Sequence, residues 1–204
     1  EKTGTPEALY YFYWRIQTAL FMFRLNNETE KIVSSFRQTY LINPKDKYDV
    51  SIFIRNGDKS SEMPLVSFHS YAYPLEILYR ILERKITVFV DSDSQKAINY
   101  FLSLDRTKFD LSYFNYTKPN QGFHLKKLKT NTYDHAIQSF ADLQESIRGN
   151  YIIGTLASNW NRIILELRLA LKEPMNLPYF EVGSIECISP SQCKRLNCDL
   201  YFEW

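Results

Sequence analysis

The chain has 204 residues, of which 45% are hydrophobic and 16% aromatic, and its formal net charge at pH 7 is +2. This composition predicts a folded protein with a full apolar core and excludes a disordered chain. The small charge gives no global field toward nucleic acid or an anionic membrane, and no apolar run reaches membrane-spanning length. The chain begins at Glu1 in a polar segment, so we expect a processed product or a fragment.

Hydrophobic periodicity predicts helices and strands that alternate along most of the chain. The expected helices are at 6–25, 28–40, around 75–81, from the N-cap at Asp93 or Ser94 to about 102, at 132–147 and at 158–171. The expected strands are at 48–55, 85–90, 109–116, 150–155 and 179–182. The stretch at 117–132 is polar, basic and turn-rich, and its lysines at 126–129 are expected to be a solvated surface.

The strands are apolar without alternation, which is typical of strands buried on both faces. Together with the strand–helix order, this predicts an α/β fold: a Rossmann-like parallel sheet with helices on both faces. We expect a helical N-terminal segment at 1–45 that packs on the core, a Rossmann-like domain at 46–185 and a cysteine-containing tail at 186–204.

Polar clusters follow three of the predicted strands, at Arg55–Glu62, Asp91–Asp93 and Thr155–Asn161. Ligands of open parallel sheets bind at the carboxyl ends of the strands, so we expect the clusters to converge there. The guanidinium of Arg55 presents a planar fork of donors that suits phosphate oxygens. The alternative is that Arg55 pairs with Asp58, or with an acid elsewhere, and only fixes the loop.

The other polar residues allow more than one interpretation. Lys59 and Glu62 can form a proton relay in which the carboxylate takes a proton from an attacking hydroxyl group, or they can be solvated loop charges. The turn Gly154–Trp160 can bind an anion at a helix N-terminus, or it can be an ordinary capped turn. Asp93 can cap a helix or contact a nucleotide, and we expect no metal at Asp91-Ser92-Asp93.

Cysteines and glycosylation motifs favour a secretory protein. Cys187, Cys193 and Cys198 lie close together, which favours one local disulfide and a free thiol over a zinc site. Sequons begin at Asn27 and Asn115. We therefore expect a location in the secretory pathway, in the Golgi lumen or outside the cell.

Three motifs, in this order, resemble those of the core-fucosylating α1,6-fucosyltransferase family and its wider fucosyltransferase relatives. They are IFIRNGDKSSE at 52–62, VFVDSD at 88–93 and GTLASNWNR at 154–162, and the resemblance covers roughly residues 10–182. It implies the nucleotide-sugar lobe of a GT-B-type glycosyltransferase. The expected donor is GDP-fucose, the acceptor a glycan or glycoprotein, and no metal or other cofactor is needed.

The resemblance also implies roles for single residues. Arg55 would bind the β-phosphate of GDP-fucose and the charge that develops on the leaving diphosphate, and Glu62 would be the general base with Lys59 as its relay partner. Asp93 would lie near the nucleotide, and Asp142 matches an aspartate that recognises guanine. The pyrophosphate would be held at the helix start by Thr155, Ala157, Ser158 and Asn159.

The chain departs from the family pattern at Phe53, where the family has histidine, and at Asn56, where it has a basic residue. The loop between Lys59 and Glu62 is also shorter by one residue than in the core-fucosylating enzymes. We expect inverting, metal-independent transfer of fucose. The alternatives are a catalytically silent nucleotide- or glycan-binding module on the same fold and a transferase that uses another nucleotide sugar.

Overall fold

The computed structural model describes residues 6–56, 65–116, 132–171 and 178–183. The helices are α1 (Pro6–Met22), α2 (Asn27–Tyr40), α3 (Phe68–Leu82), α4 (Gln95–Leu102), α5 (Thr132–Ser146) and α6 (Asn159–Leu171). The strands are β1 (Leu41–Ile42), β2 (Tyr48–Ile54), β3 (Ile86–Ser92), β4 (Phe109–Phe114), β5 (Gly149–Gly154) and β6 (Tyr179–Glu181).

The strands form one sheet in the order β1-β4-β3-β2-β5-β6. Strands β2 to β6 are parallel, and β1 pairs antiparallel with β4 at the edge. Without β1, the chain order of the strands is the 3-2-1-4-5 arrangement of a Rossmann fold. The expected Rossmann-like sheet is therefore confirmed, with β1 as an addition that the sequence did not predict.

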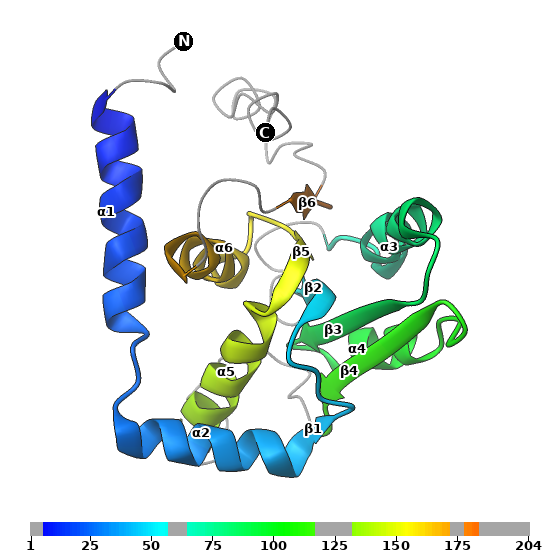
Figure 1. Cartoon of the computed structure of the whole chain (residues 1–204), viewed down its shortest axis with the longest axis horizontal. Coiled ribbons are helices and arrows are strands. Elements are labelled where there is room, and N and C mark those ends of the chain that lie inside the picture. The colour runs from blue at the N-terminus through cyan, green and yellow to red at the C-terminus, as the bar shows by residue number, and fades with distance from the viewer. Residues whose placement is uncertain (1–5, 57–64, 117–131, 172–177, 184–204) are drawn as a thin grey trace.

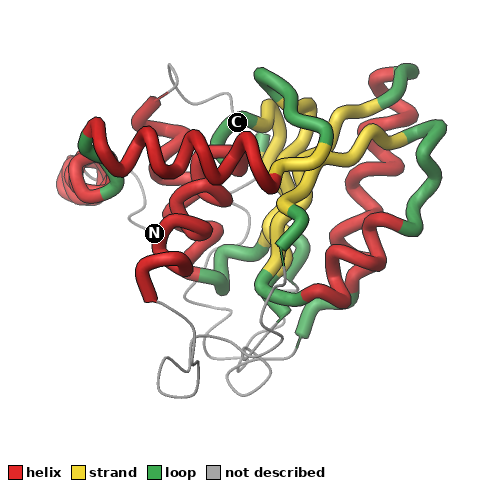
Figure 2. Tube along the Cα trace, turned by 90° about the horizontal axis from the view of Figure 1, so that it is seen from below, coloured by secondary structure: helices red, strands yellow, loops and turns green. Residues whose placement is uncertain are grey.

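Helices cover both faces of the sheet, and Figure 2 shows the strands between the two helical layers. Helices α3 and α4 pack on one face, where Leu75, Leu78 and Phe101 meet the strands in one apolar cluster. Helices α5 and α6 pack on the other face, with α2 outside α5 and α1 outside α6 (Figure 1). The N-terminal helices thus pack on the core, while the division into domains stays a prediction.

All seven residues of the central strand β2 are buried. This is why apolar and polar residues do not alternate along its sequence. Val50, Ile52 and Ile54 face α3 and α4, and Phe53 faces α5 and α6. Asp49 is buried at the amino end of the strand, where Arg84 and Thr87 donate hydrogen bonds to its carboxylate. A charge in this strand is tolerated because its oxygens are satisfied.

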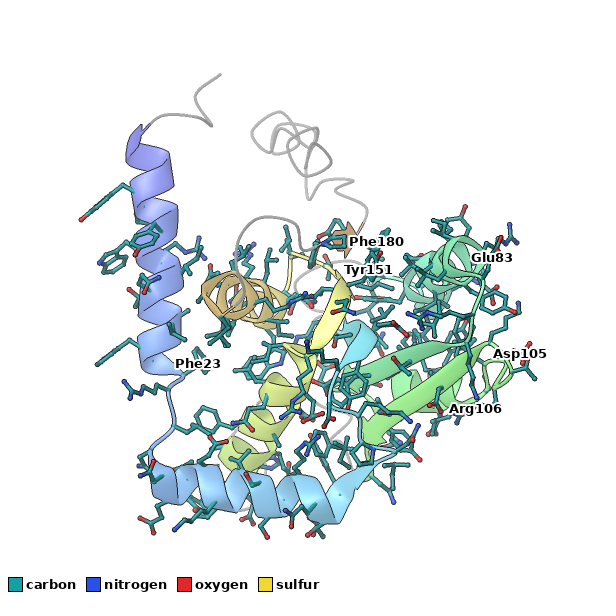
Figure 3. All side chains as sticks on the ribbon, in the orientation of Figure 1. Phe23, Glu83, Asp105, Arg106, Tyr151 and Phe180 are labelled. Carbon is teal, nitrogen blue, oxygen red and sulfur yellow. The ribbon has the colours of Figure 1, made fainter. Side chains whose placement is uncertain are left out.

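At the edge between β5 and β6, the rings of Tyr151 and Phe180 pack against each other with their centroids 6.1 Å apart (Figure 3).

Within the described residues, no helix is both long and apolar enough to cross a membrane.

Candidate functional site

The order of the strands reverses between β2 and β5, which is where open α/β sheets bind ligands. Ile52 pairs with Ile153 at this boundary, so the two strands end side by side. Arg55 directly follows β2, and Thr155 directly follows β5. The structure therefore brings two of the three predicted clusters together, and β3 delivers the third on the other side of β2.

Arg55 forms an ion pair with Asp93, and a second oxygen of the same carboxylate accepts the backbone N–H of Asn56 at 2.8 Å. Both side chains are largely buried, with 20% of the Arg55 side chain and 17% of the Asp93 side chain exposed. Asp93 lies close enough because β3 runs beside β2, with Ile54 opposite Ser92. Arg55 thus pairs with an acid elsewhere in the chain, and its guanidinium lies at the strand ends. Its role toward a phosphate stays a prediction.

The backbone N–H groups of the turn between β5 and α6 donate to partners within the protein. Leu156 donates its N–H to Glu181 at 2.8 Å, Ala157 to the hydroxyl of Thr155 at 3.3 Å, and Ser158 to the carbonyl oxygen of Thr155 at 3.0 Å. These three N–H groups are therefore already bonded within the protein. The donors that helix geometry leaves open begin with the first turn of α6, after Ser158.

Ser158 stands at the N-cap position of α6, because its carbonyl oxygen accepts the N–H of Arg162 at 3.2 Å. The side chains of Thr155 and Ser158 are buried, whereas Ala157 and Asn159 are exposed. The exposed residues and the start of α6 are therefore the part of this turn that a ligand can reach.

Sequence reasoning missed two residues at these strand ends, Tyr71 and Glu181. Burial raises the pKa of Glu181 above the usual range, although N–H groups of Leu156 and Gly183 and hydroxyls of Thr155 and Tyr179 counteract the shift. Burial also raises the pKa of Tyr71, and the Glu181 and Asp93 carboxylates add to the shift. Glu181 could have been suspected as an acid at the end of an apolar strand. Tyr71 gave no signal within the apolar pattern of α3.

Asp142 lies on α5 and is buried, and the hydroxyl of Tyr116 donates a hydrogen bond to it. Asp142 and Tyr116 form an acidic cluster with Asp91, which is also buried. Burial and the carboxylates of Asp142 and Asp91 raise the pKa of Tyr116 well above its usual value. Tyr116 therefore stays protonated. A guanine base that binds Asp142 would have to replace the hydrogen bond from Tyr116 or share the Asp142 carboxylate with it.

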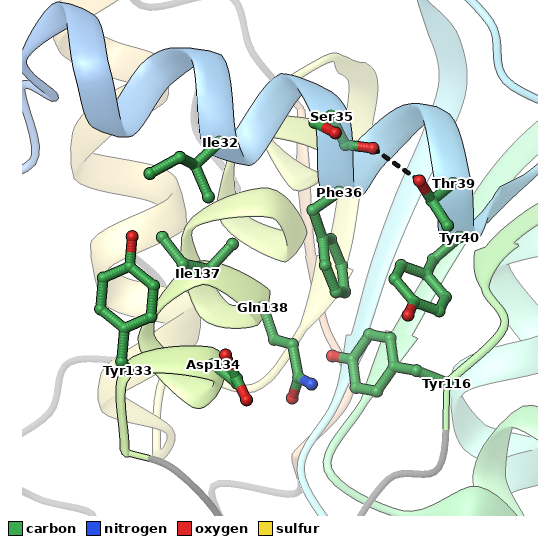
Figure 4. A pocket seen from close by; sticks show the side chains of 10 residues that line it. All are labelled: Ile32, Ser35, Phe36, Thr39, Tyr40, Tyr116, Tyr133, Asp134, Ile137 and Gln138. Atoms are coloured by element: carbon green, nitrogen blue, oxygen red, sulfur yellow. Dashed lines mark hydrogen bonds between the residues drawn. The ribbon is translucent and has the colours of Figure 1, made fainter.

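A pocket of about 520 Å³ lies between α2 and α5, next to this cluster (Figure 4). Its walls combine aromatic rings with polar side chains. The lining residues are Ile32, Ser35, Phe36, Thr39, Tyr40, Tyr116, Tyr133, Asp134, Ile137 and Gln138. Tyr116 belongs to both the pocket and the acidic cluster, so it connects the pocket with Asp142.

Phe53, which replaces the family's histidine, lies in the core and not at the site surface. Its side chain is buried, and its ring lies 6.4 Å from that of Trp160. Its carbonyl oxygen accepts a hydrogen bond from Asn161 at 3.3 Å, which ties the start of α6 to β2. Position 53 therefore contributes packing and offers no polar group to a nucleotide.

Several predicted residues fall outside the described part of the chain: Gly57, Asp58, Lys59, Glu62, Cys187, Cys193 and Cys198. The proton relay and the disulfide stay predictions. Among the described residues, no group of three or more His, Cys, Asp or Glu side chains could hold a metal ion.

Comparison with known proteins gives distant structural similarity only. No protein-family model matches the chain, and no curated protein sequence matches it either. Similar crystal structures include POFUT1 in complex with GDP-fucose, at 13% identity over 78% of this chain and 47% of that chain, with a TM-score of 0.43. A second crystal form of that complex has a TM-score of 0.45, at 13% identity over 78% of this chain and 48% of that chain.

NodZ α-1,6-fucosyltransferase soaked with GDP-fucose is also similar, at 12% identity over 71% of this chain and 43% of that chain, with a TM-score of 0.39. The chain thus spans less than half the length of these structures.

Proposed function

We propose that this chain is the nucleotide-sugar lobe of a fucosyltransferase that takes its donor from GDP-fucose and its acceptor from glycans or glycoproteins. The observation that carries the proposal is that Arg55 directly follows β2 and the turn into α6 directly follows β5, at neighbouring strand ends where the strand order of a Rossmann-like sheet reverses. A fixed cation and the open N–H groups of a helix start are two groups that stabilise a diphosphate.

The proposed reaction is a direct displacement at the anomeric carbon. An acceptor hydroxyl oxygen forms the new glycosidic bond while the bond to the β-phosphate oxygen breaks, and GDP leaves with inversion at the carbon. The acceptor's proton passes to Glu62, which Lys59 keeps ionised. Arg55 stabilises the negative charge that develops on the leaving diphosphate, because a partly buried donor is most effective there. No metal takes part in this scheme.

Asp142 is the proposed selector for guanine, since N1–H and N2–H₂ of that base are adjacent donors that suit one carboxylate. Asp93 would orient Arg55 from the side, and Thr155, Ala157, Ser158 and Asn159 would surround the pyrophosphate. In this arrangement the nucleotide lies along the carboxyl ends of β3, β2 and β5. We place the protein in the secretory pathway, where glycoprotein acceptors occur.

Isothermal titration with GDP tests the proposal. The wild type should bind, and Arg55→Ala should lose roughly 2–4 kcal/mol of binding free energy, the usual effect of removing one charge-stabilising donor. Arg106→Ala is the control, because Arg106 is exposed on the turn between α4 and β4. No binding at millimolar GDP, or equal affinity of wild type and Arg55→Ala, would overturn the proposal.

A catalytically silent nucleotide- or glycan-binding module is the second candidate. The packing of Phe53 in the core favours it, because a polar group of the family pattern is absent at the strand end. Turnover separates the two candidates. If GDP binds but neither donor hydrolysis nor transfer to any glycan occurs, and Glu62→Gln changes nothing, the protein is a binding module.

A further inference from the structure

A carboxylate that has no part in the proposed reaction is bonded to the turn that leads into α6. Glu181 ends β6, which runs parallel to β5 (Figure 1). Its two oxygens accept the backbone N–H groups of Leu156 at 2.8 Å and of Gly183 at 3.0 Å. The hydroxyl groups of Thr155 and Tyr179 also donate to it. All four of these donors are neutral groups.

The chain closes tightly over this carboxylate. A Cβ atom at Gly183 would lie 2.4 Å from the hydroxyl oxygen of Thr155 and 2.8 Å from Oε1 of Glu181, so the approach requires glycine. The side chain of Thr155 is buried, and Glu181 is itself only partly exposed. Water therefore screens the carboxylate poorly, and this desolvation raises the pKa of Glu181.

Glu181 also shares a neighbour with the acid that holds Arg55. The phenol of Tyr71 on α3 is fully buried, and the carboxylates of Glu181 and Asp93 both raise its pKa. Both carboxylates therefore lie within electrostatic reach of one hydroxyl group. Because Asp93 pairs with Arg55, two carboxylates and one guanidinium gather around the strand ends where the proposed diphosphate binds.

The two acids differ in how their charge is balanced. The guanidinium of Arg55 lies against Asp93, whereas N–H and hydroxyl groups hold Glu181. A phosphate group at neutral pH adds roughly one and a half to two negative charges to its surroundings. Repulsion between like charges favours the uncharged form of a carboxyl group. The carboxyl that only neutral donors hold is therefore the one that a diphosphate disturbs most.

We propose that Glu181 takes up a proton from solvent when the diphosphate of the donor binds at the start of α6. This inference rests on the proposed function, because it needs a diphosphate at that place. The protonated carboxyl keeps a carbonyl oxygen as an acceptor for the turn and gains an O–H donor. Because the coupling between two ligands is reciprocal, donor binding is favoured at lower pH and release of GDP at higher pH.

The phenols and guanidinium groups around Glu181 keep their protons in the same pH range. Burial raises the pKa of both Tyr71 and Tyr179, so these phenols stay protonated at neutral pH. Arg162 of α6 lies within electrostatic reach of Tyr179, and its guanidinium, like that of Arg55, stays charged. Proton uptake is therefore assigned to the Glu181 carboxyl.

The alternative is that Glu181 is a constant anion that only fixes the turn. In that role its removal changes the affinity for GDP but not the number of protons that bind with GDP. The proton balance therefore separates the two roles.

Titration calorimetry of the full chain with GDP tests the inference, at about pH 6 in buffers of different ionisation enthalpy, which is above the ordinary pKa of a glutamate. The wild type should take up on the order of half a proton more than Glu181→Gln. The proton equilibria of GDP and of the histidines are common to both proteins and cancel in this difference. Glu83→Gln should match the wild type, because Glu83 is exposed at the end of α3.

Affinity should follow the same coupling. Between about pH 7.5 and about pH 5, the wild type should gain about tenfold in affinity for GDP relative to Glu181→Gln, which corresponds to a rise of one in the pKa of the carboxyl on binding.

Infrared difference spectra of the wild type need no variant. Addition of GDP should produce the carbonyl band of a protonated carboxyl group. If GDP binds without that band, or with equal proton uptake in wild type and Glu181→Gln, this inference is overturned while the proposed function stands. If the wild type does not bind GDP, the proposed function is overturned and this inference with it.

Discussion

Asp93 holds Arg55 from two directions, because one carboxylate binds both the guanidinium of Arg55 and the backbone N–H of Asn56. The residues are 38 positions apart in sequence and meet because β3 lies parallel to β2. The carboxylate fixes the strand end, but it also competes with any diphosphate for the same guanidinium.

Asp93→Asn should therefore tighten GDP binding by about fivefold, equivalent to about 1 kcal/mol. The amide keeps an oxygen for the Asn56 N–H while the negative charge beside the phosphates disappears. Asp93→Ala should instead lower the free energy of unfolding by about 1–3 kcal/mol, since it leaves the Asn56 N–H unsatisfied. Titration calorimetry and urea unfolding measure the two effects, and weaker binding in Asp93→Asn would contradict the competition.

Glu181 should make stability depend on pH, because burial raises the pKa of its carboxyl. A raised pKa means that the folded protein holds the proton more tightly than the unfolded chain does. The resulting stabilisation is present below the pKa of an unfolded glutamate and is lost as the pH rises through the folded value. Glu181→Gln removes this dependence, so the variant should gain stability relative to the wild type as the pH rises.

Urea unfolding of both proteins at about pH 5 and about pH 8 measures this difference. Glu83→Gln is the control, because Glu83 is exposed at the end of α3. A stability difference between Glu181→Gln and wild type that is the same at both pH values would show that Glu181 does not titrate differently on folding.

Gly154 is required by a close approach between β5 and α6. A Cβ atom at this position would meet the amide group of Asn161, which donates to the carbonyl oxygen of Phe53. Gly154→Ala should displace Asn161 and cost about 1–3 kcal/mol of stability, as overpacking of a core does. Because Asn161 ties α6 to β2, GDP binding should weaken as well.

Gly154→Ala combined with Asn161→Ala is the matched test. If the clash with Asn161 is the cause, the double variant should be no less stable than Asn161→Ala alone in thermal unfolding. An additive loss would place the cause elsewhere.

Much of the fold could be predicted from sequence, because its strands are runs of buried β-branched and aromatic residues bounded by polar turns. The pattern located β2, β3 and β5 within a residue or two, and hence the strand ends with Arg55 and Thr155. The two-residue strand β1 was missed because so short an element has no periodicity.

The partners within the site could not be predicted, because contacts between side chains depend on strand order and register. The pairing of Arg55 with Asp93 needs β3 beside β2, and that of Leu156 with Glu181 needs β6 beside β5. Burial of Phe53 against Trp160 likewise follows from the position of α6. Sequence therefore predicted which residues stand at the strand ends and not what each one binds.

Arg168 lies fully buried on α6, and among the residues that the structure describes only one of its nitrogens has a hydrogen-bond partner, the carbonyl oxygen of Asn150 at 2.9 Å. Burial lowers the pKa of Arg168 to about 10, so the group is still charged at neutral pH and its desolvation opposes folding. Arg168→Met keeps a long, flexible side chain and removes the charge. It should raise the free energy of unfolding by roughly 1–4 kcal/mol, as replacement of buried charges by apolar residues often does.

Urea unfolding at neutral pH measures the change, with Arg106→Met as the exposed control. A less stable Arg168→Met protein would show that the bond to Asn150 outweighs the desolvation of the guanidinium.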